Sequence, residues 1–184
     1  MQHDRYNEKE IVEQLKDPSL RNDAFASVVK MYSSKIYWHI RNMVLSHEDA
    51  DDLVQETFIK AWNSIETFRG ESHISTWLYR IAVNETLTFM KKKRPEMVSI
   101  DSEEGMFASE IESDVFFCGD RCDALLREAV SRLPEKQRLA FNMKYFEEMK
   151  YEEISEILDT SVGALKASYH IAVKKIEKFI EEND

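Results

Sequence analysis

The sequence predicts an all-α fold made of two small helical domains, and three observations support this prediction. Apolar residues recur at steps of three and four through most of residues 7–94 and 124–182, which is the spacing of a helix with one buried face. Only 4 of the 184 residues are glycine and 3 are proline, so residues that tight β-turns require are scarce. Residues 96–122 show no such period, and we interpret them as a flexible acidic linker between domains at residues 1–95 and 123–184.

Four helices are expected in the first domain. The first spans residues 8–16, with Asn7 as its N-cap and Pro18 just after its end. The second runs from about residue 23 to residue 44. Its apolar positions are Phe25, Val28, Val29, Tyr32, Ile36 and Ile40.

The third and fourth helices of this domain flank Gly70. Ser46 and Asp49 form a capping box that starts the third helix. The fourth helix covers residues 74–94 and is expected to end at Pro95. The buried face of the third helix consists of Ala50, Val54, Phe58, Ala61 and Ile65.

The second domain is expected to contain a helix-turn-helix. Pro134 suits the first turn of a helix over residues 135–146, and a short helix over residues 151–158 follows. About three residues then lead to a last helix, which is capped by Ser161 and ends near residue 182; this is the connection length of the motif. The buried stripe of the last helix consists of Val162, Leu165, Tyr169, Ala172, Ile176 and Phe179.

The formal net charge of −10 is concentrated in one segment. Residues 1–94 hold 14 basic and 14 acidic residues, residues 95–123 hold 1 and 9, and residues 124–184 hold 10 and 12. The two domains are therefore close to neutral and can carry local basic patches. Affinity for free DNA is still expected to be weak, because few phosphates can be neutralised.

The sequence indicates a cytoplasmic protein without membrane insertion. No run of 18 apolar residues exists, and residues 1–10 lack the apolar core of a secretory signal. The two cysteines, Cys118 and Cys122, are expected to be free thiols, because no other zinc ligands accompany them at a suitable spacing. No metal-ligand cluster, phosphate-binding glycine loop or nucleophile–base pair is evident in the sequence, which predicts neither a cofactor nor an enzyme.

The exposed face of the last helix is suited to DNA. Residues 162–180 carry four lysines and one glutamate, and small residues near the helix start allow the backbone to approach a groove. Lysine and histidine side chains on this face can donate to bases or phosphates. An ordinary helical hairpin with a solvated lysine face is the alternative. The residues of this face are Gly163, Lys166, Ala167, His170 and Lys174.

The third and fourth helices present surfaces of opposite charge. Asp49, Asp52 and Glu56, with Gln55 beside them, form an acidic stripe that is either plain solvated surface or a docking site for a basic protein. Trp62 nearby is either an interface anchor or a core residue.

The basic face of the fourth helix follows an aromatic, hydroxyl-containing loop at residues 68–72, a combination that suits single-stranded nucleic acid. The alternative is a helix whose C-terminal lysines only improve solubility and complement the helix dipole. The residues expected on this face are Thr76, Arg80, Asn84, Lys91 and Arg94.

Three segments together resemble the extracytoplasmic-function (ECF) sigma factors of bacterial RNA polymerase. Residues 49–62 resemble the segment that binds the clamp helices of the polymerase β′ subunit. Residues 68–84 resemble the reader of the minus-ten promoter element, and residues 133–138 with the helix-turn-helix resemble the reader of the minus-thirty-five element. The resemblance follows the family's order and spans nearly the whole chain.

The resemblance implies a transcription initiation factor that reads the minus-ten element as single-stranded DNA and the minus-thirty-five element as a duplex. The implied partners are core polymerase, through its β′ clamp helices and β flap, and promoter DNA; the family often has an anti-sigma factor as well. The linker would lie in the active-site cleft and RNA exit path of the polymerase. Polymerase-binding residues implied by the resemblance are Asp49, Asp52, Gln55, Glu56 and Trp62. Minus-ten residues are Phe68, Arg69, Gly70, Ser72, Ser75, Thr76, Trp77, Arg80, Asn84, Lys91, Lys92, Lys93 and Arg94. Minus-thirty-five residues are Ser161, Gly163, Lys166, Ala167, His170 and Lys174.

The sequence departs from the family pattern in two places. Ala167, Tyr169 and Ala172 stand where many relatives have arginine, and His73 and Ile74 replace small or aromatic residues of the minus-ten loop. Two other classes of protein compete with the sigma interpretation. One is a helical adaptor or anti-sigma factor that binds protein only, and the other is a classical activator or repressor with a sensory N-terminal domain. The basic fourth helix and its loop argue against both, since neither class needs a single-strand reader.

Overall fold

A computed structural model describes residues 3–44, 46–68, 70, 72–97 and 121–183, and these residues are helical with short connections and no strand. The predicted all-α class is therefore confirmed. The first domain contains α1 (His3–Lys16), α2 (Arg21–Val44), α3 (His47–Ser64), the single 3-10 turn η1 (Ile65–Thr67) and α4 (Ile74–Met97). The second domain contains α6 (Arg121–Ser131), α7 (Glu135–Tyr145), α8 (Tyr151–Leu158) and α9 (Val162–Asn183).

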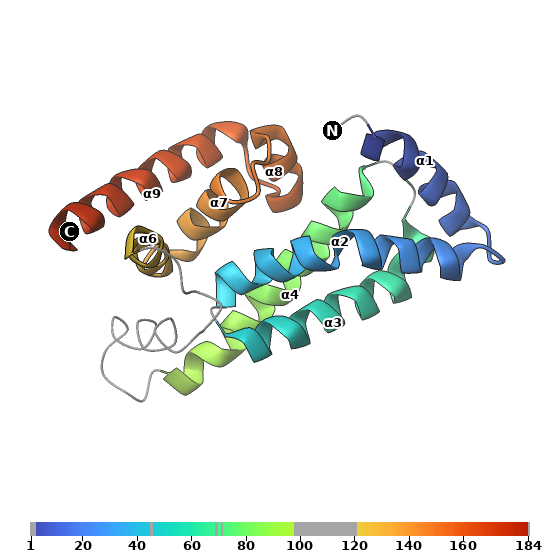
Figure 1. Ribbon diagram of the computed structural model, residues 1–184, viewed down its shortest axis with the longest axis horizontal. Helices are drawn as coiled ribbons and strands as arrows, with labels where there is room; N and C mark the ends of the chain where they lie inside the picture. The colour runs from blue at the N-terminus through green and yellow to red at the C-terminus, as the bar shows by residue number, and fades with distance from the viewer. Residues whose placement is uncertain (1–2, 45, 69, 71, 98–120, 184) are drawn as a thin grey trace.

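The first domain is a bundle in which α2 and α3 lie side by side, α4 crosses both, and α1 folds back along the start of α2 (Figure 1). Ile36 and Ile40 of α2 and Leu78 of α4 are completely buried at its centre. The predicted buried face of α3 is correct, since Ala50, Phe58, Ala61 and Ile65 are buried and Val54 is half-buried.

Three details of this domain differ from the sequence prediction. Helix α1 begins at His3, so Asn7 lies inside the helix and is not its N-cap. The prediction that α4 ends at Pro95 is wrong by two residues: α4 continues to Met97, although a proline removes one N–H donor and its ring crowds the carbonyl four residues earlier. The capping box of α3 is half formed: the Asp49 N–H donates to Ser46 Oγ at 3.4 Å, but the Asp49 carboxylate binds Lys93 Nζ at 2.6 Å.

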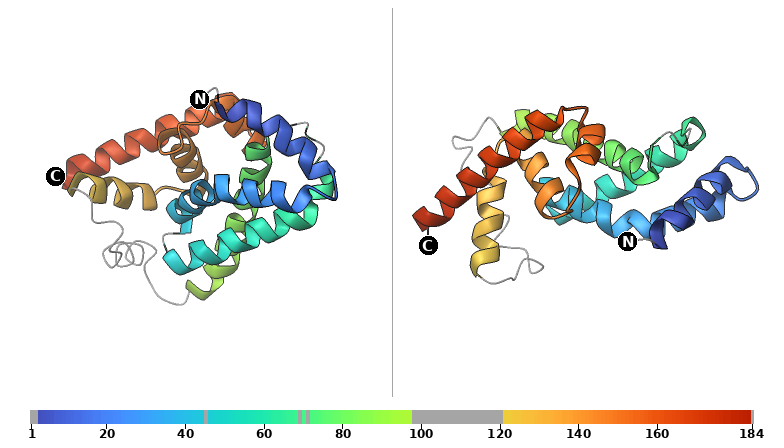
Figure 2. Two further views of the ribbon diagram at one scale, coloured as in Figure 1. Left: turned by 45° about the vertical axis from the view of Figure 1, so that its right-hand side comes forward. Right: turned by 90° about the horizontal axis from the view of Figure 1, so that it is seen from above.

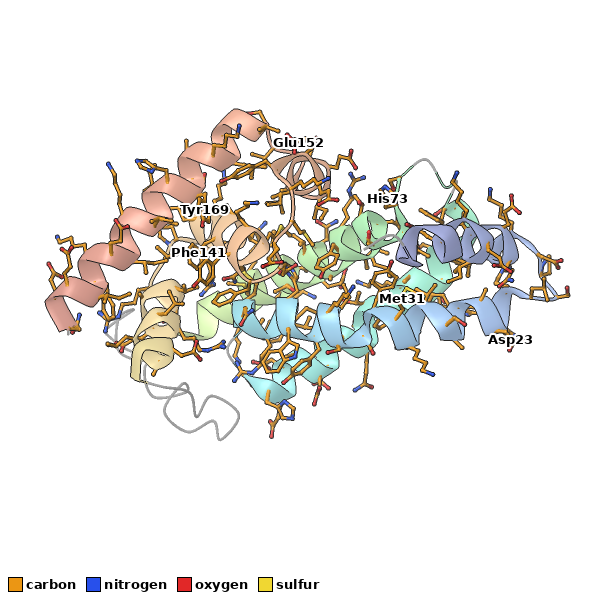
Figure 3. All side chains as sticks on the ribbon, turned by 45° about the horizontal axis from the view of Figure 1, so that its top comes forward. Asp23, Met31, His73, Phe141, Glu152 and Tyr169 are labelled. Atoms are coloured by element: carbon orange, nitrogen blue, oxygen red, sulfur yellow. The ribbon has the colours of Figure 1, made fainter. Side chains whose placement is uncertain are left out.

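The second domain packs α6, α7 and α9 around Phe141. Its ring stacks on Tyr169 of α9, with the ring centres 5.7 Å apart, as the labelled side chains in Figure 3 show. Ala172 and Ile176 are buried on the same stripe of α9. Between α8 and α9 the chain turns sharply through Asp159, whose φ of 48° is left-handed. The predicted helix-turn-helix is present.

The two domains pack directly against each other. Helix α8 lies against α4, and α7 lies against α2, so that all the views in Figures 1 and 2 show the second domain resting on the first. One continuous apolar cluster contains the core of the first domain together with Leu139 and Met143 of α7 and Ile154 and Ile157 of α8. A separate, smaller cluster holds α6, α7 and α9 together.

None of the helices in the described part of the chain is long and apolar enough to cross a membrane. Most of the expected linker, residues 98–120, lies outside the described residues, and so do the expectations about its flexibility and about Cys118.

Candidate functional site

The outward face of α9 is available to a ligand along its whole length. Gly163, Lys166, Ala167, His170 and Lys174 are all exposed, and a Cβ placed at Gly163 would meet nothing within 4 Å. Ser161 caps the helix, because its Oγ accepts the Ala164 N–H at 3.3 Å. The start of α9 is therefore rigid, narrow and open, which is what insertion into a DNA groove requires.

Lys166 is held over an aromatic ring. Its Nζ lies 5.6 Å from the centre of the Tyr151 ring on α8. The Nζ of Lys144, on α7, lies 5.3 Å from the same ring centre. Burial raises the pKa of Tyr151, and the neighbouring Tyr169 adds to this effect, so the phenol stays neutral. The ring therefore limits the directions in which the Lys166 ammonium can point.

The acidic stripe of α3 is solvent-exposed. Asp52, Gln55 and Glu56 are exposed along one face, and the Glu56 carboxylate lies 3.7 Å from Lys60 Nζ, an exposed pair that contributes little stability. Ile59 lies one turn from Gln55 and is 54% exposed, although it is a large apolar residue. The sequence pattern does not identify Ile59, which belongs to neither the acidic stripe nor the buried face of α3.

Asp49 and Trp62 are less available than the sequence suggested. The Asp49 carboxylate is engaged by Lys93 of α4, which couples the ends of the two charged surfaces. Trp62 is half-buried, and its ring meets Phe25 edge-to-face with the ring centres 5.0 Å apart. Of its two interpretations, the core role therefore accounts for most of the Trp62 side chain.

Helix α4 exposes part of the expected cationic face. Arg80, Asn84, Lys91 and Lys92 are exposed, but Thr76 is buried, with 4% of its surface accessible. The prediction that Thr76 shares this face is wrong, because the first turns of α4 are covered by packed helices and only the later turns are open. The Arg94 side chain lies outside the described residues.

The loop before α4 is shaped by its aromatic residues. Phe68 is buried, and its ring lies 5.0 Å from that of half-buried Trp77. Gly70 has a φ of +76°, a left-handed conformation that favours glycine, while Ser72 is exposed and Ser75 half-buried. Arg69 lies outside the described residues. As the loop stands, Phe68 and Trp77 form its floor rather than a free stacking platform.

The cationic face of α4 touches the second domain. The Arg80 guanidinium donates to the backbone carbonyl of Glu156 at the C-terminal half of α8. In this arrangement the helix-turn-helix therefore occupies Arg80, one of the donors expected on the cationic face of α4.

Two family models match the chain, Sigma-70 region 2 over residues 28–96 and Sigma-70, region 4 over residues 123–176. Among curated proteins, the ECF RNA polymerase sigma factor SigW of Bacillus subtilis (strain 168) is 34% identical over 170 residues, which covers 87% of this chain and 90% of SigW. The ECF RNA polymerase sigma-E factor of Escherichia coli (strain K12) is 30% identical over 167 residues, which covers 86% and 87% of the two chains. The chain belongs to the ECF sigma factors. It is a transcription initiation factor that directs RNA polymerase to promoters.

The fold of this sigma factor is also found in solved structures. CnrH in complex with the cytosolic domain of CnrY has a TM-score of 0.71 at 19% identity, covering 96% of this chain and 99% of that chain. The sigma factor RpoE in complex with the anti-sigma factor NepR from Bartonella quintana has a TM-score of 0.69 at 22% identity, covering 85% and 96%.

A polar group buried between the two domains of the sigma factor was not found from the sequence. The Nδ1 of His39 on α2 donates to the carboxylate of Glu147, just after α7, at 2.6 Å, and the His39 side chain is fully buried. The Asn142 amide donates to the backbone carbonyl of Asn42 at 3.2 Å. Burial raises the pKa of Tyr79, whose ring contacts His39, and the Glu147 carboxylate raises it further.

The polar contacts between the domains are incompletely satisfied. Among the described residues, no partner lies within hydrogen-bonding distance of His39 Nε2 or Asn142 Oδ1, although both atoms are buried. Arg138 of α7 is buried as well, and burial lowers its pKa. The His39 and Asn142 atoms lie where α7 meets α2, so separation of the two domains would expose them to solvent. No sequence signal identifies such a pair, since His39 and Glu147 are 108 residues apart.

Proposed function

We propose that this sigma factor docks on core polymerase through the outward face of α3. Asp52, Gln55 and Glu56 supply the charged and polar contacts to the β′ clamp helices, and Ile59 supplies an apolar contact beside them. All four side chains are exposed, so the face is ready for a partner without rearrangement. Asp49 supports the interface through its ion pair with Lys93, and Trp62 holds α3 on the body of the domain.

The minus-ten element is then read by α4 and its preceding loop. Arg80, Asn84, Lys91 and Lys92 hold the non-template strand and the upstream phosphates, because they line the open turns of α4. Half-buried Lys93 adds positive charge beside them while it stays paired with Asp49. The loop over residues 68–75 receives an unstacked base, with Phe68 and Trp77 as its floor.

The minus-thirty-five element is read in the major groove by α9. Gly163 and Ala167 allow close approach, while Lys166, His170 and Lys174 donate to bases or phosphates. The capped start of the helix and the ring beneath Lys166 fix these donors before DNA arrives. Region 4 also contacts the β flap, so that polymerase holds both domains near one promoter and offsets weak affinity for free DNA.

Promoter reading requires the two domains to separate. The carbonyl of Glu156 and the minus-ten strand compete for Arg80, and α8 covers the start of α4. The closed arrangement is therefore the form of the free protein, and binding to polymerase selects the open one.

The sigma factor acts in the cytoplasm by binding and catalyses no reaction of its own. The solved structures of RpoE with NepR and of CnrH with CnrY support an anti-sigma factor as a regulator of this chain too. The domain boundaries at residues 95 and 123 belong to the same proposal.

The observation that carries this proposal is that an acidic face on α3 and a cationic face on α9 are both open on one chain. The test is to mix the purified sigma factor with bacterial core polymerase and to measure complex formation by gel filtration. Run-off transcription from a promoter library follows. Failure to bind core, or binding without promoter-dependent initiation, would refute the proposal.

Removing the donors of α9 should weaken use of the minus-thirty-five element. We expect the double variant Lys166→Ala, His170→Ala to lose about 30-fold or more in initiation, since each base contact contributes about 1–3 kcal/mol. Lys175→Ala removes one lysine charge from another face of the same helix and should change little. The loss should vanish on a template whose duplex ends between the two elements and therefore lacks the minus-thirty-five region. Equal loss on both templates would place these residues elsewhere than at that element.

A further inference from the structure

We propose that Glu8 of α1 is a positioning residue for the base-reading loop, and that it thereby sets minus-ten specificity. The inference rests on the proposed role of the loop over residues 68–75. Glu8 lies outside the residues that match the Sigma-70 region 2 model, which begin at residue 28. Nothing in the sequence pattern connects Glu8 with the loop, because the contact joins positions 65 and 66 residues apart.

Glu8 caps the N-terminus of α4 from another helix. Its Oε1 accepts the backbone N–H of Ile74 at 2.7 Å, and its Oε2 accepts from the ring Nδ1 of His73 at 3.0 Å. The Glu8 side chain is 17% exposed, whereas the His73 side chain is 52% exposed. The first N–H groups of a helix have no partner within the helix, so the carboxylate satisfies one of them and also opposes the positive end of the helix dipole.

Helix α1 makes a second, independent contact with the loop at Gly70. A Cβ built at Gly70 would lie 3.2 Å from Cγ1 of Val12, which is closer than most real Cβ contacts, and the backbone φ of +76° already disfavours other residues. Gly70 and His73 of the loop therefore both lie against α1. Figure 3 shows His73 at the start of α4, beside α1.

The carboxylate acts on the loop and not on the fold of α1. Helix α1 is anchored in the domain core by Ile11 and Leu15, which are 5% and 4% exposed and do not depend on Glu8. Loss of the carboxylate should leave α1 in place but free the start of α4 and His73. Because an unstacked base is selected by the shape of its pocket, a loop that samples several shapes should accept more bases.

The experiment compares polymerase holoenzymes that carry the wild-type sigma factor or its Glu8→Ala or Glu8→Gln variant. The control variant is Glu13→Ala, because the Glu13 side chain is exposed on the same helix. Each holoenzyme transcribes a promoter library with a randomised minus-ten element and a randomised minus-thirty-five element, and the transcripts are sequenced. For Glu8→Ala we expect the preference at the melted minus-ten base to fall by up to about fivefold, because loss of one helix cap changes the equilibrium that holds the loop in its base-selective shape by about that factor. Glu8→Gln should fall less, because an amide oxygen can still accept the Ile74 N–H. Core binding and the minus-thirty-five preference should not change.

Three results would overturn the inference. One is an unchanged minus-ten profile for Glu8→Ala with core binding intact, and another is an equal change in Glu13→Ala. The third is a loss spread equally over both promoter elements, which is the behaviour of a general folding defect. A wild-type holoenzyme without any minus-ten preference would instead contradict the proposed function of the loop, so the two failures are distinguishable.

Discussion

Replacing Asp52 and Glu56 by arginine is expected to reduce the affinity of the sigma factor for core polymerase by about 100-fold or more. Both carboxylates are exposed on α3, and reversing their charge places like charges opposite a basic partner, which costs several kcal/mol at an interface. The fold should tolerate the change because neither side chain is buried. Binding is measured by titrating core polymerase against labelled sigma factor, and the fold is checked by circular dichroism.

The matched control reverses two exposed carboxylates on α1, Glu10 and Glu13, with the same change in net charge. If this control lowered affinity equally, the effect would be one of overall charge and not of the α3 face. Retained affinity in the Asp52→Arg, Glu56→Arg variant would move the polymerase site away from α3. A variant of Ile59, such as Ile59→Ser, separates the apolar part of the interface from the charged part, and a smaller loss is expected there.

Local periodicity accounts for what could be predicted from the sequence. The step of three and four residues identified the buried sides of α3 and α9, and the opposite sides then had to be exposed. Asp52, Glu56, Lys166 and His170 are exposed for this reason. The Ser161 cap was equally local, since its partner lies three residues away.

Contacts between distant segments could not be predicted in this way. Thr76 lies at the three-to-four-residue spacing of the cationic face, yet it is buried by neighbouring helices. Asp49 lies at the spacing of the acidic face, yet its carboxylate forms an ion pair with Lys93 of another helix. The cap that Glu8 provides and the closure of the two domains depend on the same kind of long-range contact. A single sequence carries no periodic signal for any of them.

Replacing His39 by leucine is expected to open the two domains. The change removes the His39 partner of the Glu147 carboxylate and leaves it only the Tyr79 hydroxyl, while the Glu147 side chain is only 11% exposed in the closed form. An uncompensated buried charge costs about 3 kcal/mol or more, which corresponds to a shift of roughly 100-fold in the ratio of closed to open molecules. In the open form the Glu147 carboxylate is solvated, so His39→Leu destabilises the closed form and not the folding of either domain.

The single variant Glu147→Leu should open the domains for the converse reason, since it leaves the buried His39 Nδ1 without an acceptor.

The measurement is a distance distribution between spin labels at Lys30 of α2 and Lys178 of α9, both exposed, in a background where Cys118 and Cys122 are serine. Each single variant should populate longer distances than the wild type, and the double variant His39→Leu, Glu147→Leu should close again, because two apolar side chains can replace a buried pair. Glu152→Leu, at an exposed position of α8, controls for the added leucine.

The opened variants should also bind a single-stranded minus-ten oligonucleotide more tightly, since Arg80 is then released from the Glu156 carbonyl. Two outcomes would contradict this prediction: wild-type distances in His39→Leu, or a double variant that stays as open as either single variant. In either case the pair of His39 and Glu147 does not hold the domains together. The apolar contact between α4 and α8 would then control whether Arg80 is free for DNA.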